Sequence, residues 1–209
     1  MTQRTLWGRL NSINVQKVLW LCEDLGLNFE RVDAGLQFGV NQTSDYLAMN
    51  PNGLVPTLKE NDFVLWESHS ILRYLAKAHD PSATLYPQAL KDCALVDQWL
   101  DWSTTTAWPP MRILFWGWIR TAENERNKSD LEKNRLIMQK MLKILDDQLS
   151  QQAWVAGEHF TLADIPLALI VHRWLLLPIE REPLAHLQRW FTQVSQRPGF
   201  IRYGSSPLT

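Results

Sequence analysis

Three short stretches in the first half of the chain carry side chains that could bind or activate a small ligand. The first is the polar loop Arg9–Asn14, in which Asn11, Ser12 and Asn14 come just before a helical pattern. A hydroxyl in this place, with helix N–H groups behind it, could stabilise a thiolate or an oxyanion. A serine that attacked a substrate would need a base, and the sequence assigns no histidine to Ser12.

The second stretch is Val55-Pro56, at the mouth of an expected strand. Proline donates no hydrogen bond, and a cis peptide bond would turn the chain sharply. The backbone N–H and C=O of Val55 would then face outward and could pair with an extended peptide as a further strand does. The alternative is a trans proline that only begins a strand, which its placement alone favours.

The third stretch is Glu67-Ser68, at the start of an expected helix. A ligand carboxylate would be held by the Ser68 hydroxyl and the free N–H groups of the first turn, and Glu67 could pair with an ammonium group. The two residues together suit the head of an α-amino acid, which carries both charges. Taken alone, they also fit an ordinary serine N-cap beside a solvated acid.

Other kinds of chemistry have less support in the sequence. The five histidines show no metal-ligand spacing with one another or with cysteine, so no metal is expected. Cys22 and Cys93 are too few for a disulfide framework, and Cys22 lies on the apolar face of its helix. A net charge of −1 argues against a nucleic acid or an anionic membrane as partner. The most apolar stretch, 165–179, is too short and too charged to span a bilayer, and no signal peptide is visible; a reduced, cytoplasmic setting is expected.

The periodicity predicts two domains of different class. The expected elements of the first are a strand at 5–7, a helix from about 15 to 25 with Gly26 as its C-cap, a strand at 29–32, a short helix at 44–49, a hairpin at 57–59 and 63–66, and a helix with Ser68 as its N-cap that ends before Pro81. The opening β-α-β unit implies a parallel, right-handed crossover. We therefore predict a mixed α/β domain over 1–80, a linker over 81–90 and an all-helical domain over 91–209, in which Pro109-Pro110 breaks or kinks a helix.

These features together resemble the glutathione S-transferase superfamily over essentially the full length. The matching motifs, in the order of that family, are Ser12-x-Asn14-x-x-Lys17-Val18, Asn50-Pro-Asn-Gly-Leu-Val-Pro56, Trp66-Glu-Ser-His-Ser-Ile71 and Thr161-x-x-Asp164. The finer resemblance is to the bacterial theta-like and beta-like groups. It implies the glutathione transferase fold, which is a thioredoxin-like domain followed by a helical one.

The resemblance also implies roles for particular residues. It implies that the Val55–Pro56 bond is cis and that Val55 pairs with the cysteinyl backbone of glutathione. Glu67 and Ser68 would hold the γ-glutamyl head, with Asn11 as a further glutathione contact. The Thr161-x-x-Asp164 motif would be a structural capping box that matters for folding.

The catalytic residue is less uniform across the family. Alignment backward from Gly26 places Ser12 at the catalytic serine of theta-like members and Asn14 near the catalytic cysteine of beta-like members. A mixed-disulfide mechanism is therefore not expected, and Ser12 is predicted to stabilise the glutathione thiolate, with Asn14 or Arg9 as substitutes. Arg9 could alternatively select an anionic second substrate.

The function predicted from this resemblance is a cytoplasmic, homodimeric glutathione transferase. Candidates for the wall that holds the small electrophile are Trp108, Met111, Arg112 and Trp116, for which packing in the core or in a dimer is the alternative. Other predictions that stay open are a glutathione-dependent dehalogenase, a disulfide-bond reductase and a non-catalytic binding protein with the same fold.

Overall fold

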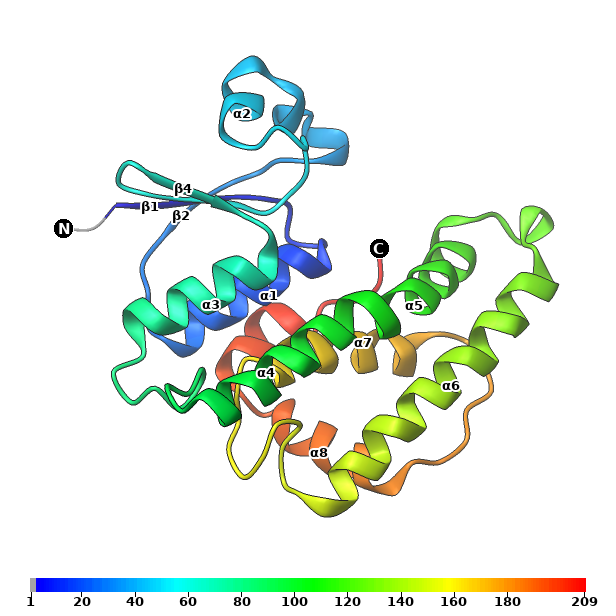
Figure 1. Cartoon of the computed structure of the whole chain (residues 1–209). Helices are drawn as coiled ribbons and strands as arrows, with labels where there is room; N and C mark the ends of the chain where they lie inside the picture. Colours follow the sequence, from blue (N-terminus) through cyan, green and yellow to red (C-terminus); the bar gives the residue numbers. More distant parts are fainter. Residues whose placement is uncertain (1–2) are drawn as a thin grey trace. The chain divides into compact units, whose positions relative to one another are not determined.

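The computed structural model describes residues 3–209, which divide into two compact units. The first unit comprises the chain up to Ala83 together with Pro198–Gly204, and the second comprises Thr84–Arg197 with Ser205–Thr209. The first is a sheet with helices and the second is helical, so the predicted fold class is confirmed (Figure 1). None of the helices in the described part of the chain is long and apolar enough to cross a membrane.

The first unit is built on a four-stranded sheet in the order β2-β1-β3-β4. Its elements are β1 Arg4–Trp7, α1 Ile13–Asp24, β2 Glu30–Val32, α2 Ser44–Met49, β3 Thr57–Glu60, β4 Phe63–Trp66 and α3 Ser68–His79. Strand β1 pairs parallel with β2 and antiparallel with β3, which forms the predicted hairpin with β4. Two single 3-10 turns, Leu36–Phe38 and Val40–Gln42, precede α2.

Helices α1 and α3 lie side by side on one face of this sheet, and α2 lies on the other side (Figure 1). Apolar residues on the facing surfaces, among them Leu6, Leu19, Leu58 and Leu72, are at most 1% exposed and form the core of the unit. Leu25 is the C-cap residue of α1 and the expected cap, Gly26, follows it: Gly26 has φ of 62°, and the N–H of Leu27 donates to the Cys22 carbonyl at 2.8 Å. That pairing satisfies the last turn of the helix.

A segment from the far end of the sequence completes the first unit. A π turn at Phe200–Gly204 packs on α1, and the rings of Phe200 and Trp20 meet edge to face with centroids 5.4 Å apart. The Asp24 carboxylate accepts from the Trp20 indole N–H and from the Gly199 N–H, each at 3.0 Å. A Cβ at Gly199 would lie 2.1 Å from Trp20 Cδ1, so only glycine allows this approach.

The second unit consists of α4 Leu90–Trp102, α5 Trp108–Phe115, α6 Lys128–Gln151, α7 Asp164–Leu176 and α8 Ala185–Val194, with π turns at Ser103–Ala107 and Trp116–Arg120 and a 3-10 turn at Glu123–Glu125. The α-helical pairing stops at Trp102 and resumes at Trp108, as expected from Pro109-Pro110. Both prolines thus fall in the first turn of α5, where a missing N–H costs no hydrogen bond.

The predicted capping box joins three parts of the second unit. The Asp164 carboxylate is fully buried and accepts from the N–H of Thr161 at 2.8 Å, the N–H of Val155 at 3.1 Å and the indole N–H of Trp190 at 2.8 Å. Burial raises the pKa of Asp164 to about 6, although these hydrogen bonds favour the charged form. Asp164 therefore ties the start of α7 to α8 and to the loop that precedes α7.

Candidate active site

The sheet register brings the three predicted stretches together at one end of the strands in the first unit. Trp7, Thr57 and Trp66 stand opposite one another in β1, β3 and β4. Strands β1 and β4 finish at this end of the sheet, and β3 begins there. The loop after β1, the proline before β3 and the start of α3 therefore lie together, because the pairing of neighbouring strands fixes where each adjoining segment begins.

The backbone of the loop after β1 is held by the end of β2. The N–H of Gly8 donates to the Val32 carbonyl at 2.9 Å, and the Arg31 guanidinium donates to the Gly8 carbonyl at 2.9 Å. A Cβ at Gly8 would lie 2.3 Å from a methyl group of Val15, so the glycine lets α1 pack against the loop. These contacts fix the position of the loop that carries Ser12 and leads into α1.

Ser12 is the N-cap residue of α1 and is 7% exposed. Its carbonyl accepts from the Gln16 N–H at 2.9 Å, but its side chain makes no capping hydrogen bond to the helix. A serine at this place usually satisfies a helix N–H with its hydroxyl. Here the hydroxyl is not used in that way, which suits a group that donates to a ligand. Asn11, the preceding residue, is half-buried in the same loop.

Arg9 lies beside the proline loop. A Cβ on Gly35 would be 2.9 Å from a guanidinium nitrogen of Arg9 and 3.4 Å from a methyl group of Val55. Both side chains therefore approach Gly35 closely, and the guanidinium is a neighbour of Val55. This proximity keeps Arg9 among the candidates for contact with a ligand thiol or with an anionic substrate.

The Val55–Pro56 peptide bond is cis, as the resemblance implied. The preceding carbonyl, that of Leu54, accepts from the Tyr46 hydroxyl at 2.5 Å and from the Asn50 side-chain amide at 2.9 Å. The same two side chains reach the buried hydroxyl of Thr57, at 2.8 and 3.1 Å. Val55 and Pro56 are thus bracketed by two anchored residues.

Helix α3 begins one residue earlier than a cap at Ser68 would place it. Glu67 is its N-cap residue, with φ of 71° and no capping hydrogen bond from its side chain, and Ser68 is the first helical residue. The N-cap prediction for Ser68 was therefore wrong by one position. Positive φ is uncommon for a non-glycine residue and is found at ligand sites. The Glu67 side chain is exposed to solvent, whereas Ser68 is buried, with 6% of its surface exposed.

A buried polar cluster joins the starts of α1 and α3. Lys17 is 7% exposed, and its ammonium donates to Asn14 Oδ1 at 3.0 Å and lies 3.1 Å from His69 Nε2. Burial lowers the pKa of His69 to about 2, and the charges of Lys17 and Arg73 act in the same direction. His69 is therefore neutral and accepts from Lys17, which leaves its own proton on Nδ1.

The four candidates for the electrophile wall do not share one face of their segment. Trp116 is 47% exposed and Arg112 is exposed, and with the half-buried Trp108 they recur every four residues. Met111 is fully buried in the second unit. The prediction for Met111 as an open wall therefore does not fit its place in the core, since residues 107, 110, 111, 114 and 115 form the buried stripe of this stretch.

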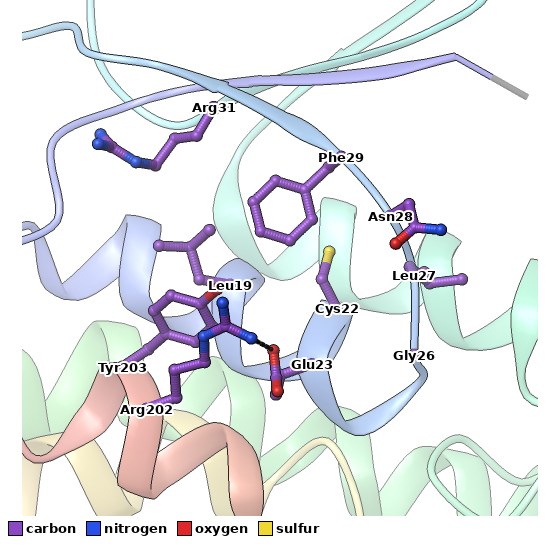
Figure 2. Close-up of a pocket in the computed structure, with 10 residues that line it drawn as sticks. All are labelled: Leu19, Cys22, Glu23, Gly26, Leu27, Asn28, Phe29, Arg31, Arg202 and Tyr203. Carbon is purple, nitrogen blue, oxygen red and sulfur yellow. Dashed lines mark hydrogen bonds and ion pairs between the residues drawn. The ribbon is translucent and has the colours of Figure 1, made fainter.

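A pocket of about 460 Å³ lies elsewhere on the first unit, between the second half of α1, β2 and the C-terminal π turn (Figure 2). Its charged groups are already paired: Arg202 with Glu23 at 2.8 Å and Arg31 with Asp33. Cys22 lines it, but burial raises the pKa of that thiol to about 12, which makes it a poor nucleophile. The pocket contains none of the predicted site residues.

Tyr46 and Asn41 were not singled out in the sequence, and Asn50 was quoted there only as part of a motif, without a role of its own. Tyr46 and Asn50 hold the loop before Val55, and the buried Asn41 donates to the Gly53 carbonyl at 2.5 Å. Their spacing from Pro56 would suggest nothing unless the path of the loop were known. Among residues 3–209 there is no group of three or more His, Cys, Asp or Glu side chains that could hold a metal ion.

Comparison with known proteins gives the same result along the whole chain. The family model of the glutathione S-transferase N-terminal domain matches residues 2–77, and that of the C-terminal domain matches residues 99–198. The chain is 37% identical to the glutathione S-transferase GstB of Escherichia coli K12, over 98% of this chain and 99% of that protein. It is 30% identical to glutathione S-transferase 1 of Manduca sexta, over 92% and 88% of the two chains.

A solved structure is similarly close. The theta class glutathione S-transferase of Xanthomonas axonopodis pv. citri, with glutathione bound, superimposes with a TM-score of 0.94 at 42% identity over all of both chains. Its apo form gives a TM-score of 0.85. Matches of this extent, together with the fold and the cis proline, lead to one conclusion: the chain belongs to the glutathione S-transferase family.

Proposed function

We propose that this protein is a glutathione transferase that binds glutathione at the end of the sheet described above, beside the loop after β1 and the start of α3, and promotes attack of the glutathione thiol on a small electrophile. The observation that carries the proposal is that Ser12, the cis Val55–Pro56 bond and Ser68 at the start of α3 lie together at one end of the sheet. The relatives named above support it, one of them solved with glutathione bound.

The tripeptide would use all three stretches. The backbone of Val55 pairs with the cysteinyl residue of glutathione in the manner of an added strand. The γ-glutamyl carboxylate accepts from the Ser68 hydroxyl and the first N–H groups of α3, and Glu67 pairs with the ammonium group. Asn11 is a further contact from the loop after β1. Glutathione is a substrate here, and no metal takes part in these steps.

The chemical step begins with loss of the thiol proton to solvent. A free thiol has a pKa of ~8.5 and is mostly protonated at pH 7. The Ser12 hydroxyl donates to the thiolate, which lowers that pKa, with Asn14 or Arg9 as the alternative donors. The sulfur then forms a bond to the electrophilic carbon, and the leaving group departs with the bonding electrons. Trp108, Arg112 and Trp116 remain the predicted contacts of the electrophile.

The experiment that tests the proposal is a titration of glutathione into the protein while thiolate absorbance is followed against pH. Binding with a lowered thiol pKa, followed by a stable thioether with a test electrophile, is the expected result. Oxidised glutathione as product would favour a reductase, and halide release a dehalogenase. Absence of glutathione binding would overturn the proposal and favour a non-catalytic protein with this fold.

Single substitutions would separate the three candidate donors. Ser12→Ala is expected to raise the pKa of the bound thiol while affinity changes little. Asn14→Ala and Arg9→Ala are the comparisons. If activity survives Ser12→Ala and is lost in one of the other two, the assignment of Ser12 is wrong.

We also propose a homodimer in the cytoplasm. Strand β4 is an edge strand, and it carries Phe63 at 46% and Trp66 at 38% exposure. Large apolar side chains on a sheet edge favour contact with another chain. Light scattering should give twice the mass of 24.3 kDa, and Phe63→Lys should reduce it toward the monomer. A monomeric wild type would refute the dimer.

A further inference from the structure

We propose that Lys17 is a positioning residue for the transferase reaction: its buried ammonium, held by Asn14 and His69, supplies a fixed positive charge beneath the starts of α1 and α3 that favours the glutathione thiolate. The inference rests on the proposed function. It concerns a residue that touches neither substrate but acts through the two helix ends that do.

The geometry gives the charge a fixed position. Lys17 lies in the second turn of α1 and is bonded to Asn14, in the first turn, at 3.0 Å. His69 directly follows Ser68 in α3, and its Nε2 lies 3.1 Å from the same ammonium. One cation therefore links the helix that begins after Ser12 to the helix that carries Ser68.

A buried cation acts more strongly than an exposed one. Lys17 is 7% exposed, so solvent and salt screen its field much less than they screen that of a surface lysine. Neither of these two contacts brings a negative charge to the ammonium, because Asn14 is uncharged and His69 is neutral. The sign matches the chemistry: glutathione carries a γ-glutamyl carboxylate at one helix start and gains a thiolate charge at the other.

Three other charged residues, Arg73, Arg9 and Glu67, also lie in this part of the first unit. Arg73 lies one turn after His69 on α3 and contributes to the field at His69. Arg9 stands near Val55, and Glu67 is exposed at the start of α3. All of these charged side chains stay in the sequence when Lys17 alone is replaced, so the comparison of Lys17→Met with Lys17→Arg tests the charge at position 17.

The experiment compares the pKa of bound glutathione in Lys17→Met, Lys17→Arg and wild type, from thiolate absorbance against pH. Lys17→Met is expected to raise it by about one unit, which lowers the thiolate fraction near pH 6.5 roughly tenfold, with an equal loss in kcat. Lys17→Arg keeps the charge and should stay within about 0.3 unit. The exposed Lys77, near the far end of α3, gives the matched control: Lys77→Met should leave the pKa unchanged.

Two further measurements separate charge from structure. The difference between Lys17→Met and wild type should persist in 1 M salt, where the Debye length is about 3 Å and the effects of exposed charges vanish. If Lys17→Met does not fold, as judged by circular dichroism, Lys17→Gln takes its place, because it keeps a polar group for Asn14. His69→Gln retains an acceptor for the ammonium and should behave as wild type, whereas His69→Leu leaves the charge but removes one contact that holds it, and should raise the pKa of the bound thiol less than Lys17→Met does.

The outcomes distinguish this inference from the proposed function. If wild-type protein does not lower the thiol pKa at all, the transferase proposal fails and this one falls with it. If wild type lowers the pKa and the folded neutral variant of Lys17 lowers it equally, only the role of Lys17 is refuted. A pKa that rises equally in Lys17→Arg would show that the shape of the lysine, and not its charge, matters.

Discussion

The double anchor on the Leu54 carbonyl leads to a prediction about Tyr46 and Asn50. Each side chain donates to that carbonyl and reaches the Thr57 hydroxyl, which is fully buried. Tyr46→Phe removes one hydroxyl and keeps the ring, while Asn50 still serves both groups. The expected cost is about 1 kcal/mol, the usual net value of a hydrogen bond whose partners remain satisfied.

Asn50→Ala is expected to cost more, about 2–3 kcal/mol, because Asn50 is 2% exposed and also accepts from the Asn52 backbone N–H at 3.1 Å. The double variant leaves the Thr57 hydroxyl and the Leu54 carbonyl without either donor. Its cost should therefore exceed the sum of the two single costs by about 1–2 kcal/mol.

Urea unfolding monitored by tryptophan fluorescence measures all three values, with Lys59→Ala as the control. Lys59 is exposed on β3, so the loss of its side chain should cost less than about 0.5 kcal/mol. Titration calorimetry with glutathione adds the functional side: affinity should fall less than about twofold in Tyr46→Phe and roughly tenfold or more in the double variant. Additive costs, or an unchanged affinity in the double variant, would refute the view that these side chains act together to hold Val55.

Three further predictions concern charge and burial. Glu67→Gln and Ser68→Ala should each weaken glutathione binding by roughly 1–3 kcal/mol, since a charged hydrogen bond loses a partner; an unchanged dissociation constant in calorimetry would remove these residues from the site. His69 binds no proton in the folded state at mild acid, while the unfolded state does so below its pKa of 6.5, so stability should be complete above pH 6.5 and fall by about 2 kcal/mol by pH 5. His69→Gln should abolish that part of the acid dependence, and parallel urea midpoints for variant and wild type would contradict this. Asp164→Ala should cost more than about 4 kcal/mol, because the Trp190 indole and other buried donors lose their acceptor; a melting temperature close to wild type would show that water replaces the carboxylate.

Local patterns were enough to predict most of the fold. The 3.6-residue spacing that begins at Val15, the turn at Asn61-Asp62 between two apolar runs, and Gly26 after the last apolar residue of α1 each act over a few residues. Interactions between residues that are close in the sequence determine such features, so they can be predicted from the sequence alone. The one-residue error at Ser68 has the opposite origin: Glu67 takes a positive φ that no local preference of glutamate would favour.

The parts of the site that could not be predicted depend on contacts between residues far apart in sequence. Lys17 and His69 are 52 positions apart, and their meeting requires α1 and α3 to lie against each other. Tyr46 reads as an ordinary apolar position of a short helix until the path of the loop brings the Leu54 carbonyl to its hydroxyl. Met111 was assigned to a wall because it lies among aromatic residues in sequence, but the face of its helix was not determined by that neighbourhood.

The segment Pro198–Gly204 has a consequence for the biogenesis of the protein. The Gly199 N–H and the Asp24 carboxylate that it meets are 175 positions apart in the chain. At about 5–20 residues per second, a ribosome needs roughly 10–35 s to make the intervening residues. During that interval the nascent α1 has neither the Phe200 ring against Trp20 nor the Gly199 backbone above it. The first unit is thus completed only after Pro198–Gly204 has been made, and a chaperone that shields apolar surface would find Trp20 accessible until then.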